Sequence, residues 1–373
     1  MTRNLAAALL AVCMVAAGCG PAQPSNAPPP SLVYLGQVEV PRGFLFDGTT
    51  VGGLSAISYD PGRQVYYVIS DDRSAKNPAR FYTVRIMFPD NKLGSVEWAG
   101  TTTLLDKGGT PFAPLAPDAA PPVIPPDPEG IAFDERRQQL YWSSEGERRS
   151  DEPARPLLLN PWVRVAGLDG DYRGEFALPA GLDMSADQTG TRQNHGLEGL
   201  TLTPDGDSLW AAMEAPGYGD GEPPTDKHGA LTRVTRFDVE TGSPTAQFAY
   251  PLDSTSAGKD GDNGLTDLVA LDDDNFLVIE RGYGTFAVAR IFRASIAGAD
   301  NVLDRPSLTG APPKAMSKTL LADLSKMPEI PYLDNVEGIT LGSKLSDGRQ
   351  SVVLVTDDNF NPQQVTQFYA FAM

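Results

Sequence analysis

The chain has 373 residues, a formal net charge of −18 at pH 7, and many glycines (37) and prolines (33). So acidic a balance argues against a nucleic-acid-binding protein, because binding to the phosphate backbone depends on a basic surface. It also argues against charge-driven docking on anionic lipid. With only two histidines and two cysteines, the composition argues against a zinc site.

The N-terminus resembles a bacterial lipoprotein signal peptide over residues 1–18. Arg3 precedes an uncharged run over residues 5–18, which is too short to span a bilayer as a mature helix. Residues 16–19 (Ala-Ala-Gly-Cys) predict cleavage before Cys19 and acylation of its sulfur. An ordinary signal peptide with an incidental cysteine is the alternative. A lipid on Cys19 predicts a membrane anchor in the bacterial cell envelope, outside the cytoplasmic membrane or in the periplasm or outer membrane.

A proline-rich segment follows over residues 19–31, with serine, asparagine and alanine between the prolines. This composition is typical of a tether and cannot build a packed core. The remaining residues, 32–373, are therefore expected to form one domain. We expect this domain to be monomeric.

The domain contains five copies of one pattern: a start that in three copies is a glutamate followed by glycine, then an apolar strand, a turn, and a second apolar strand with an acid at its end. The most regular copy begins at Asn194, turns at Asp205-Gly206 and ends at Glu214. The other copies span residues 52–72, 129–145, 266–281 and 337–358. Such copies, spaced by roughly 70 residues, are typical of a radial array of sheets.

Each interval contains about four strand signals, and these predict a β-propeller. Residues 231–239 and 245–252 complete the third copy, and residues 287–296 and 318–324 complete the fourth. The last copy has only residues 367–373 left and lacks one strand, which residues 32–40 before the first copy could supply. We therefore predict an all-β fold of five four-stranded blades, closed by pairing of the N- and C-terminal strands. Six blades are the alternative, because the insert at residues 107–127 could contain weak strands.

The acids of the repeat are expected to meet at one end of the central channel. In a propeller the first strand of each blade lines the channel and the second returns antiparallel, so the start of one lies beside the end of the other. Glu129, Glu198 and Glu337 start first strands, with Asp267 one residue later in its copy. The acids at the ends of second strands are Asp71, Glu145, Glu214, Glu280 and Asp357.

Such a cluster needs a neutralising partner. Two unit charges about 4 Å apart repel by about 4 kcal/mol at an effective dielectric near 20. Oxygen ligands suit Ca²⁺, and Mg²⁺ less well because of its stricter geometry. We predict Glu129, Glu198, Asp267 and Glu337 as inner calcium ligands, and Asp71, Glu145, Glu214, Glu280 and Asp357 as outer ligands or bases. Alternatively, these acids pair with basic neighbours or cap turns.

Three further side chains are candidates at the same mouth. Arg73 and Arg281 each lie next to a repeat acid and could clamp substrate oxygens, or form salt bridges that hold the acids. His195 could act as a general acid or donate to phosphate, or could be a packed loop histidine. The absence of a G-x-S-x-G elbow argues against a serine hydrolase.

The ordered motifs resemble the phytase-like family, which is often described as having esterase-like activity of phytase. The resemblance covers residues from about 50 to 373, and its motifs lie at residues 51–55, 128–131, 144–146, 194–200, 280–282, 335–339 and 357–360. It implies phosphoester or phosphodiester hydrolysis by the recurrent Glu and Asp residues. A more distant likeness is to the calcium-dependent β-propeller phytases, whose acidic channel mouth holds calcium ions that bind phosphate. Those proteins have six blades.

We therefore expect a metal-dependent hydrolase of small phosphorylated substrates, with Glu129, Glu198, Glu337, His195, Arg73 and Arg281 as catalytic candidates. Two other classes stay open. One is a non-catalytic envelope propeller with structural calcium that presents its loops to a protein partner. The other is a propeller lactonase, in which Glu129 or Glu198, with Asn194 and Asp267, would hold a single cation.

Overall fold

The computed structural model describes residues 31–150 and 156–373, so the lipoprotein signal and nearly all of the tether lie outside the described residues. The regular secondary structure of the described chain consists of β-strands and four short 3-10 helices. The helices are Pro89–Asn91, Ala180–Leu182, Tyr218–Asp220 and Leu324–Lys326. No helix in this part of the chain has the length and apolar character needed to cross a membrane.

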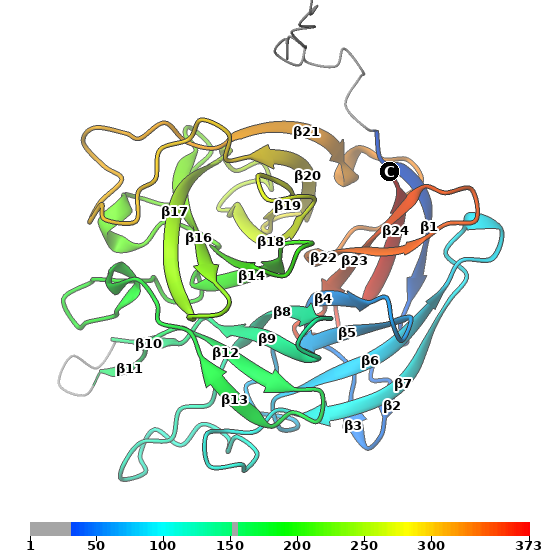
Figure 1. The fold of residues 1–373 in the computed structure, drawn as a ribbon, viewed down its shortest axis with the longest axis horizontal. Coiled ribbons are helices and arrows are strands. Elements are labelled where there is room, and N and C mark those ends of the chain that lie inside the picture. Colours follow the sequence, from blue (N-terminus) through cyan, green and yellow to red (C-terminus); the bar gives the residue numbers. More distant parts are fainter. Residues whose placement is uncertain (1–30, 151–155) are drawn as a thin grey trace, which may run out of the picture. The chain divides into compact units, whose positions relative to one another are not determined.

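Five four-stranded antiparallel sheets surround a common centre, as Figure 1 shows. The first blade is β4 (Leu54–Asp60), β5 (Val65–Ser70), β6 (Arg80–Met87) and β7 (Ser95–Thr103). The second is β8 (Pro128–Asp134), β9 (Gln139–Ser144), β12 (Trp162–Gly167) and β13 (Tyr172–Glu175). The third is β14 (Leu197–Leu202), β15 (Ser208–Met213), β16 (Ala230–Asp238) and β17 (Ser243–Leu252). The fourth is β18 (Gly264–Ala270), β19 (Asn275–Gly282), β20 (Val288–Ser295) and β21 (Ser317–Asp323).

The fifth blade combines both ends of the domain and closes the propeller, as predicted. It contains β22 (Asn335–Lys344), β23 (Gln350–Asp357), β24 (Gln367–Ala372) and the N-terminal strand β1 (Val33–Glu39). β1 pairs antiparallel with β24, from Val33 opposite Ala372 to Glu39 opposite Gln367. The six-blade alternative is wrong, because the insert at residues 107–127 forms only isolated bridges.

Two small sheets lie outside the blades. β2 (Leu45–Phe46) pairs with β3 (Thr49–Thr50), and β10 (Glu147–Arg149) pairs with β11 (Leu157–Leu159). The inner strands β4, β8, β14, β18 and β22 each contact the next one around the centre, and β22 contacts β4. The inner strands thus form a closed ring.

The hydrophobic core is divided among the five interfaces between adjacent blades. Strand β5 shows how the sequence achieves this, because successive side chains of a strand point to opposite faces of the sheet. Tyr66 and Val68 pack toward the fifth blade, whereas Val65, Tyr67 and Ile69 pack toward the second. The second strands are therefore apolar without alternation, and each blade depends on both neighbours.

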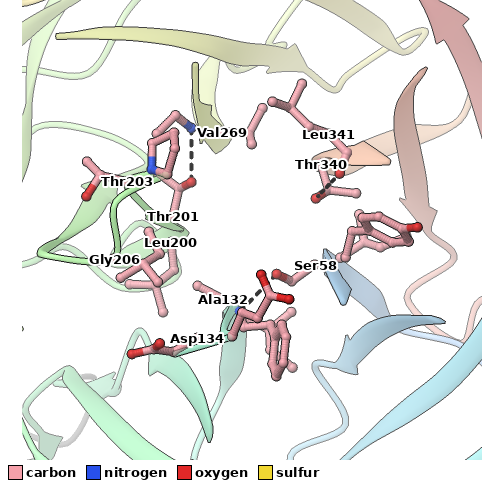
Figure 2. Close-up of a pocket in the computed structure, with 18 of the residues that line it drawn as sticks. Ser58, Ala132, Asp134, Leu200, Thr201, Thr203, Gly206, Val269, Thr340 and Leu341 are labelled. Carbon is pink, nitrogen blue, oxygen red and sulfur yellow. Dashed lines mark hydrogen bonds between the residues drawn. The ribbon is translucent and has the colours of Figure 1, made fainter. Parts of the chain in front are cut away.

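The hairpin end of the inner strands surrounds a cavity of about 270 Å³ (Figure 2). Equivalent positions of the five strands place around it Ser58, Ala132, Thr201, Val269 and Thr340. Two of the hydroxyl groups tie neighbouring strands together: Ser58 accepts a hydrogen bond from the Phe133 amide (2.9 Å) and Thr201 from the Ala270 amide (3.0 Å). The repeat carboxylates lie at the opposite end of these strands.

Closure by β1 generates a prediction about stability. A chain that begins at Pro41 lacks β1 and leaves the β24 edge and its apolar face unpaired, so we expect it to lose cooperative thermal unfolding. A chain that begins at Ser31 keeps β1 and is the control. Circular dichroism melts of the two proteins test this, and equal melting temperatures would contradict a closing role for β1.

Candidate functional site

Each of the five inner strands carries a β-bulge near its first residue. The pairing of first and second strands shifts at Leu54/Ala56, Pro128/Ile131, Leu197/Leu200, Leu265/Asp267 and Val336/Gly338. A bulge inserts an unpaired residue and re-aims its side chain. The bulged residues, which we name the inner tier, are Ser55, Glu129, Glu198, Thr266 and Glu337.

Three of the five inner-tier residues are glutamates, and all three are buried. The exposed fractions are 8% for Glu129, 8% for Glu198 and 7% for Glu337. Each belongs to a different blade, so the inner-strand ring brings their side chains to one mouth of the channel. The structure therefore brings together these three predicted ligands, and Ser55 and Thr266 complete the tier.

The position after the inner tier is where neighbouring inner strands approach most closely. A Cβ atom at Gly199 would lie 2.8 Å from Asp267 Cα, and one at Gly338 would lie 2.9 Å from Ala56 Cα. At Gly199 and Gly338 only glycine fits, because a side chain would strike the next strand. The first and fourth blades have Ala56 and Asp267 at this position. The register places Asp267 at this glycine position, not in the inner tier.

Asp267 is consequently used within the inner-strand ring. Its Oδ1 accepts hydrogen bonds from the amides of Leu268 (2.8 Å) and Leu200 (3.3 Å), and its Oδ2 accepts one from Ile339 (2.8 Å). Burial raises the pKa of Asp267 well above its ordinary value, and these three amides act in the opposite direction. The structure does not bring Asp267 into the acidic cluster, because its oxygens join β14, β18 and β22.

An outer tier lies at the ends of the second strands, one residue after the position that pairs with the residue just before each bulge. Its members are Asp71, Glu145, Glu214, Arg281 and Asp357. Four of these positions were predicted, but in the fourth blade the register places Arg281 in the tier and Glu280 one residue before it. The side chain of Glu280 therefore points to the other face of the sheet.

Glu280 lies in the interface between the third and fourth blades. Its carboxylate accepts hydrogen bonds from Tyr250 Oη (2.9 Å) and Asn263 Nδ2 (2.9 Å) and forms an ion pair with Lys318. The predicted role of Glu280 as an outer ligand does not match this position, because its oxygens are engaged away from the mouth.

Asp127 is a site residue that the sequence analysis missed. Asp127, Glu129 and Glu145 can each offer an oxygen such that the three oxygens lie within 4.8 Å of one another, and all three residues are buried. Alternate residues of a strand share a face, so the spacing Asp127-x-Glu129 was the signal that could have revealed it. This group of three carboxylates, the metal triad, has the arrangement and chemistry to hold a metal ion.

An amide at the equivalent position of the fifth blade adds a further oxygen. Asn335 lies two residues before Glu337, and its Nδ2 donates to Glu337 Oε1 (2.8 Å) and Asp357 Oδ2 (3.3 Å). Its Oδ1 is buried and has no hydrogen-bond partner among the described residues. An unpaired buried carbonyl oxygen beside acids is a suitable ligand atom for a hard cation.

Burial and mutual repulsion favour the protonated form of these carboxylates. Burial, with repulsion from Glu198 and then Asp127, raises the pKa of Glu129 well above its ordinary value. Burial and the neighbouring Glu214 and Glu145 do the same for the pKa of Glu198.

Five further carboxylates of the mouth behave in the same way. Burial and the Asp127 charge raise the pKa of Glu145, and burial and the Asp71 charge raise that of Asp357. The pKa of Asp71 is also raised, first by burial and then by Asp127. Burial raises the pKa of Asp127 to about 6 although Arg73 opposes it, and that of Glu337 to about 6 although Arg281 opposes it.

The two predicted arginines form ion pairs with the cluster. Arg281 Nη2 lies 3.2 Å from Glu214 Oε1 and 3.1 Å from Glu337 Oε1. Arg73 Nη1 lies 3.4 Å from Asp127 Oδ2, and its Nη2 pairs with Glu147. Both arginines therefore hold acids in place, which is one of the two roles predicted for them. Both guanidinium groups lie at the mouth.

His195 lies at the rim of the mouth and is half-buried. Its Nδ1 lies 3.1 Å from the Gln193 carbonyl oxygen and 3.9 Å from Glu214 Oε2. The structure thus places His195 beside the outer tier, as the sequence suggested. Its role as a general acid stays a prediction.

Comparison with known protein families shows the family to which this chain belongs. The chain belongs to the phytase-like family, described as "Esterase-like activity of phytase", whose family model matches residues 49–360. No curated protein matches the chain. Membership of this family, together with the propeller fold, fits a propeller hydrolase.

Several solved structures are similar in fold. The periplasmic gluconolactonase of Pseudomonas aeruginosa matches 90% of this chain and 93% of its own, at 13% identity and a TM-score of 0.36. An exo-β-1,3-galactanase from Phanerochaete chrysosporium matches 90% of this chain and 64% of its own, at 10% identity and a TM-score of 0.48. The hydrazine synthase of Kuenenia stuttgartiensis matches 86% and 82%, at 12% identity and a TM-score of 0.35. These TM-scores support no functional argument, so the propeller assignment depends on the blades themselves.

The raised pKa values predict an unusual pH dependence of stability. Free carboxyls ionise near pH 4, whereas Asp127 and Glu337 ionise at about 6 in the folded protein. The folded state therefore binds more protons than the unfolded chain in this window, and the free energy of unfolding falls as the pH rises. With a chelator present, we expect a lower melting temperature at pH 7.5 than at pH 5.

Calcium should reverse this trend, because a cation replaces the protons that the cluster loses. The calcium-induced rise in melting temperature should be larger at pH 7.5 than at pH 5. In the Glu129→Gln variant, which removes one charge from the cluster, the chelated protein should depend less on pH. A melting temperature that rises from pH 5 to 7.5 without metal would contradict the raised pKa values.

The position of Asp267 predicts a structural role that can be separated from metal binding. Asp267→Ala leaves three buried amides without acceptors, so we expect a loss of roughly 3 kcal/mol in the free energy of unfolding. Asp273→Ala, in the exposed turn that follows β18, is the matched control and should change it little. Urea unfolding with chelator present measures both, and equal stability of the two variants would contradict this role.

Proposed function

We propose that this protein is a calcium-dependent hydrolase of phosphoesters or phosphodiesters that acts at the acidic mouth of the propeller. One observation carries the proposal: seven carboxylates of the two tiers, together with Asp127, converge at one channel mouth. Such a concentration of buried acids is unfavourable unless cations or protons neutralise it. Membership of a family described by esterase-like activity supports hydrolysis as the reaction.

The residues present fit calcium. Asp127, Glu129 and Glu145 would hold the ion as the metal triad, and the free Oδ1 of Asn335 is a further oxygen donor at the same mouth. The donor set is entirely oxygen, which suits a hard cation and excludes the soft ligands that other metals prefer. When bound, calcium would supply the positive charge that attracts phosphoryl oxygens and makes a water molecule more acidic.

The protein's own residues supply the proton transfer. Glu198 and Glu337 are the two buried inner-tier acids that lie outside the metal triad, and repulsion from Glu214 and Glu145 helps to raise the pKa of Glu198. With a cation in the metal triad to offset this repulsion, the Glu198 carboxylate could take a proton from an attacking water and return it to the leaving group. We therefore assign Glu198 as the general base, with Glu337 as a further acid of the same tier.

The arginines orient the charges around the reaction. Arg281 bridges Glu214 and Glu337, which belong to different tiers, at 3.2 and 3.1 Å. Arg73 bridges Asp127 of the metal triad and Glu147. Each guanidinium has further N–H groups that can donate to a phosphoryl oxygen while the salt bridges persist.

A lactonase is a second candidate. The metal triad is a single compact group, as a one-cation site that polarises a carbonyl requires. The ligands differ from those expected, because Asp267 is engaged within the inner-strand ring and Asp127 takes part instead. A lactone substrate therefore belongs in the same assay.

We also propose that the protein is located in the bacterial cell envelope. Acylation of Cys19 would anchor the protein to a membrane of the bacterial cell envelope, and the tether at residues 19–31 would hold the propeller away from the lipid surface. The small phosphorylated substrate and the monomeric state are part of the same proposal. The net charge of −18 supports the absence of a nucleic-acid partner.

Hydrolysis assays test the reaction. The domain from residue 31 is given a phosphomonoester, a phosphodiester, phytate and gluconolactone, each with calcium and with chelator. We expect calcium-dependent turnover of a phosphoester, and a fall in kcat of about 10²-fold or more in Glu198→Gln. Asp127→Asn should weaken calcium binding, which calorimetry measures directly.

Glu135→Gln is the matched control. Glu135 is an exposed acid at the other end of the same hairpin as Glu129, so its substitution should leave kcat and calcium affinity unchanged. Turnover of the lactone alone would replace the phosphohydrolase with the lactonase. If no substrate is turned over while calcium still raises the melting temperature, the protein is a binding propeller with structural calcium.

A further inference from the structure

A second cavity lies beside the acidic mouth and has a different chemistry. It has a volume of about 620 Å³ and is lined on one side by Tyr283, Phe286 and Ala287, and on the other by Ile330, Tyr332 and Asp334. We name it the aromatic groove. Its volume falls within the range typical of small-molecule sites.

The aromatic groove collects aromatic side chains that the fold leaves exposed. The exposed fractions are 38% for Tyr283, 54% for Phe286 and 48% for Tyr332. These three are all of the aromatic residues among the exposed large apolar side chains of residues 31–150 and 156–373. Large aromatic surface in water is unfavourable, so its concentration in one hollow indicates a binding function.

The chain connects both walls of the groove to the mouth. One wall begins with Tyr283, two residues after Arg281 of the outer tier. The other wall ends with Asp334, directly before Asn335, whose side chain bonds Glu337 and Asp357. The ion pair between Arg281 and Glu337 (3.1 Å) joins the two strands from which the walls extend.

Hydrogen bonds hold the walls in place. Asp262 accepts from the Tyr283 amide (2.5 Å) and from Arg281 (3.2 Å), which fixes the first wall to the outer tier. Tyr332 donates from its hydroxyl to Asp334 Oδ2 (3.2 Å), and its carbonyl accepts from Tyr369 Oη (3.1 Å). The aromatic side chains are thus presented on anchored backbone.

The aromatic groove offers stacking surfaces, and the charged residues that line it are paired: Lys326 forms an ion pair with Asp323 (2.7 Å), and Asp334 accepts hydrogen bonds. Asp334 is buried, and its carboxylate accepts hydrogen bonds from the amides of Asn335 (2.9 Å) and Val365 (2.8 Å) and from Gln364 (3.2 Å). Burial and the nearby Asp334 raise the pKa of Tyr283 and of Tyr332, so both phenols are neutral. Neutral aromatic surfaces on two walls favour a flat, unsaturated ring over a linear polyol or a charged group.

We propose that the aromatic groove binds the organic group of the ester substrate and that this group carries a planar ring. The inference rests on the proposed function, because the ester bond would lie at the metal triad while the ring stacks beside Tyr283, Phe286 and Tyr332. A nucleoside and a simple aryl alcohol share this chemistry. Base stacking on aromatic side chains is tolerant of sequence and needs no hydrogen-bond readout.

Binding to the full-length protein in detergent tests the groove without catalysis. The probes are adenosine, benzyl alcohol, methyl glucoside and glycerol, followed by saturation-transfer NMR and calorimetry. We expect adenosine to bind and glycerol and methyl glucoside not to bind. Benzyl alcohol distinguishes an aryl alcohol from a nucleoside as the source of the ring. Binding of benzyl alcohol indicates a general aryl site, whereas binding of adenosine alone indicates a nucleoside site.

Variants locate the binding. Phe286→Ala and Tyr332→Ala should each weaken adenosine binding by about tenfold, whereas Tyr332→Phe keeps the ring and should bind as the wild type does. Leu320→Ala, an exposed apolar residue of β21 outside the groove, is the control. Equal adenosine affinity in all variants, or binding of methyl glucoside in place of adenosine, would overturn the proposal.

Turnover separates the two proposals. The Phe286→Ala substitution should lower kcat/KM for adenosine 5′-phosphate by about tenfold. It should leave kcat/KM for glycerol phosphate unchanged. If no phosphoester is turned over but adenosine binding depends on Phe286, ring binding in the groove is confirmed and the proposed phosphohydrolase activity is contradicted. If the wild type and Phe286→Ala hydrolyse each ester at equal rates, the phosphohydrolase activity is confirmed and ring binding in the groove is contradicted.

Discussion

The close approach of the five inner strands is the constraint on which the site depends. At the glycine position the backbones are so near that a Cβ atom at Gly199 would meet the Cα of Asp267. The strand bulges directly before this position, and the bulge turns the preceding side chain toward the mouth. The recurring Glu-Gly pair is therefore one device: glycine lets the strands converge, and the glutamate before it is placed at the channel mouth.

Charge around the mouth is uneven because the blades are not identical. The second, third and fifth blades each supply an acid to both tiers, whereas the fourth blade supplies Thr266 and Arg281. Arg281 stands at a position where the other four blades have an acid, and it neutralises Glu214 and Glu337 from there. Arg73 lies beside the metal triad on one side of the mouth, and Arg281 lies on the other side, beyond which the aromatic groove begins. A cation held by the metal triad would let this mouth accept a substrate with an anionic and an aromatic end.

Much of this architecture follows from the sequence, because blades repeat and strands alternate. The five blades and the closing strand were predictable from the spacing of the copies and from the missing strand of the last one. The register was not, since each bulge adds one residue that no periodicity shows. That single residue places Asp267 within the inner-strand ring and exchanges the positions of Glu280 and Arg281. Asp127 was overlooked although it precedes Glu129 by two residues, as Asn335 precedes Glu337, and strand geometry puts such pairs on one face.

The pairing of β1 with β24 has a consequence for how the protein is made. β1 can find its partner only after the strands of all five blades have been synthesised, because Val33 pairs with Ala372. Contacts between such distant segments form late and slow folding. Until then β24 has no outer neighbour and the fifth blade has an open edge that can pair with another chain. Closure of the propeller therefore depends on synthesis of β24, and a chain truncated before β24 would leave β1 and the β23 edge unpaired and open to other chains.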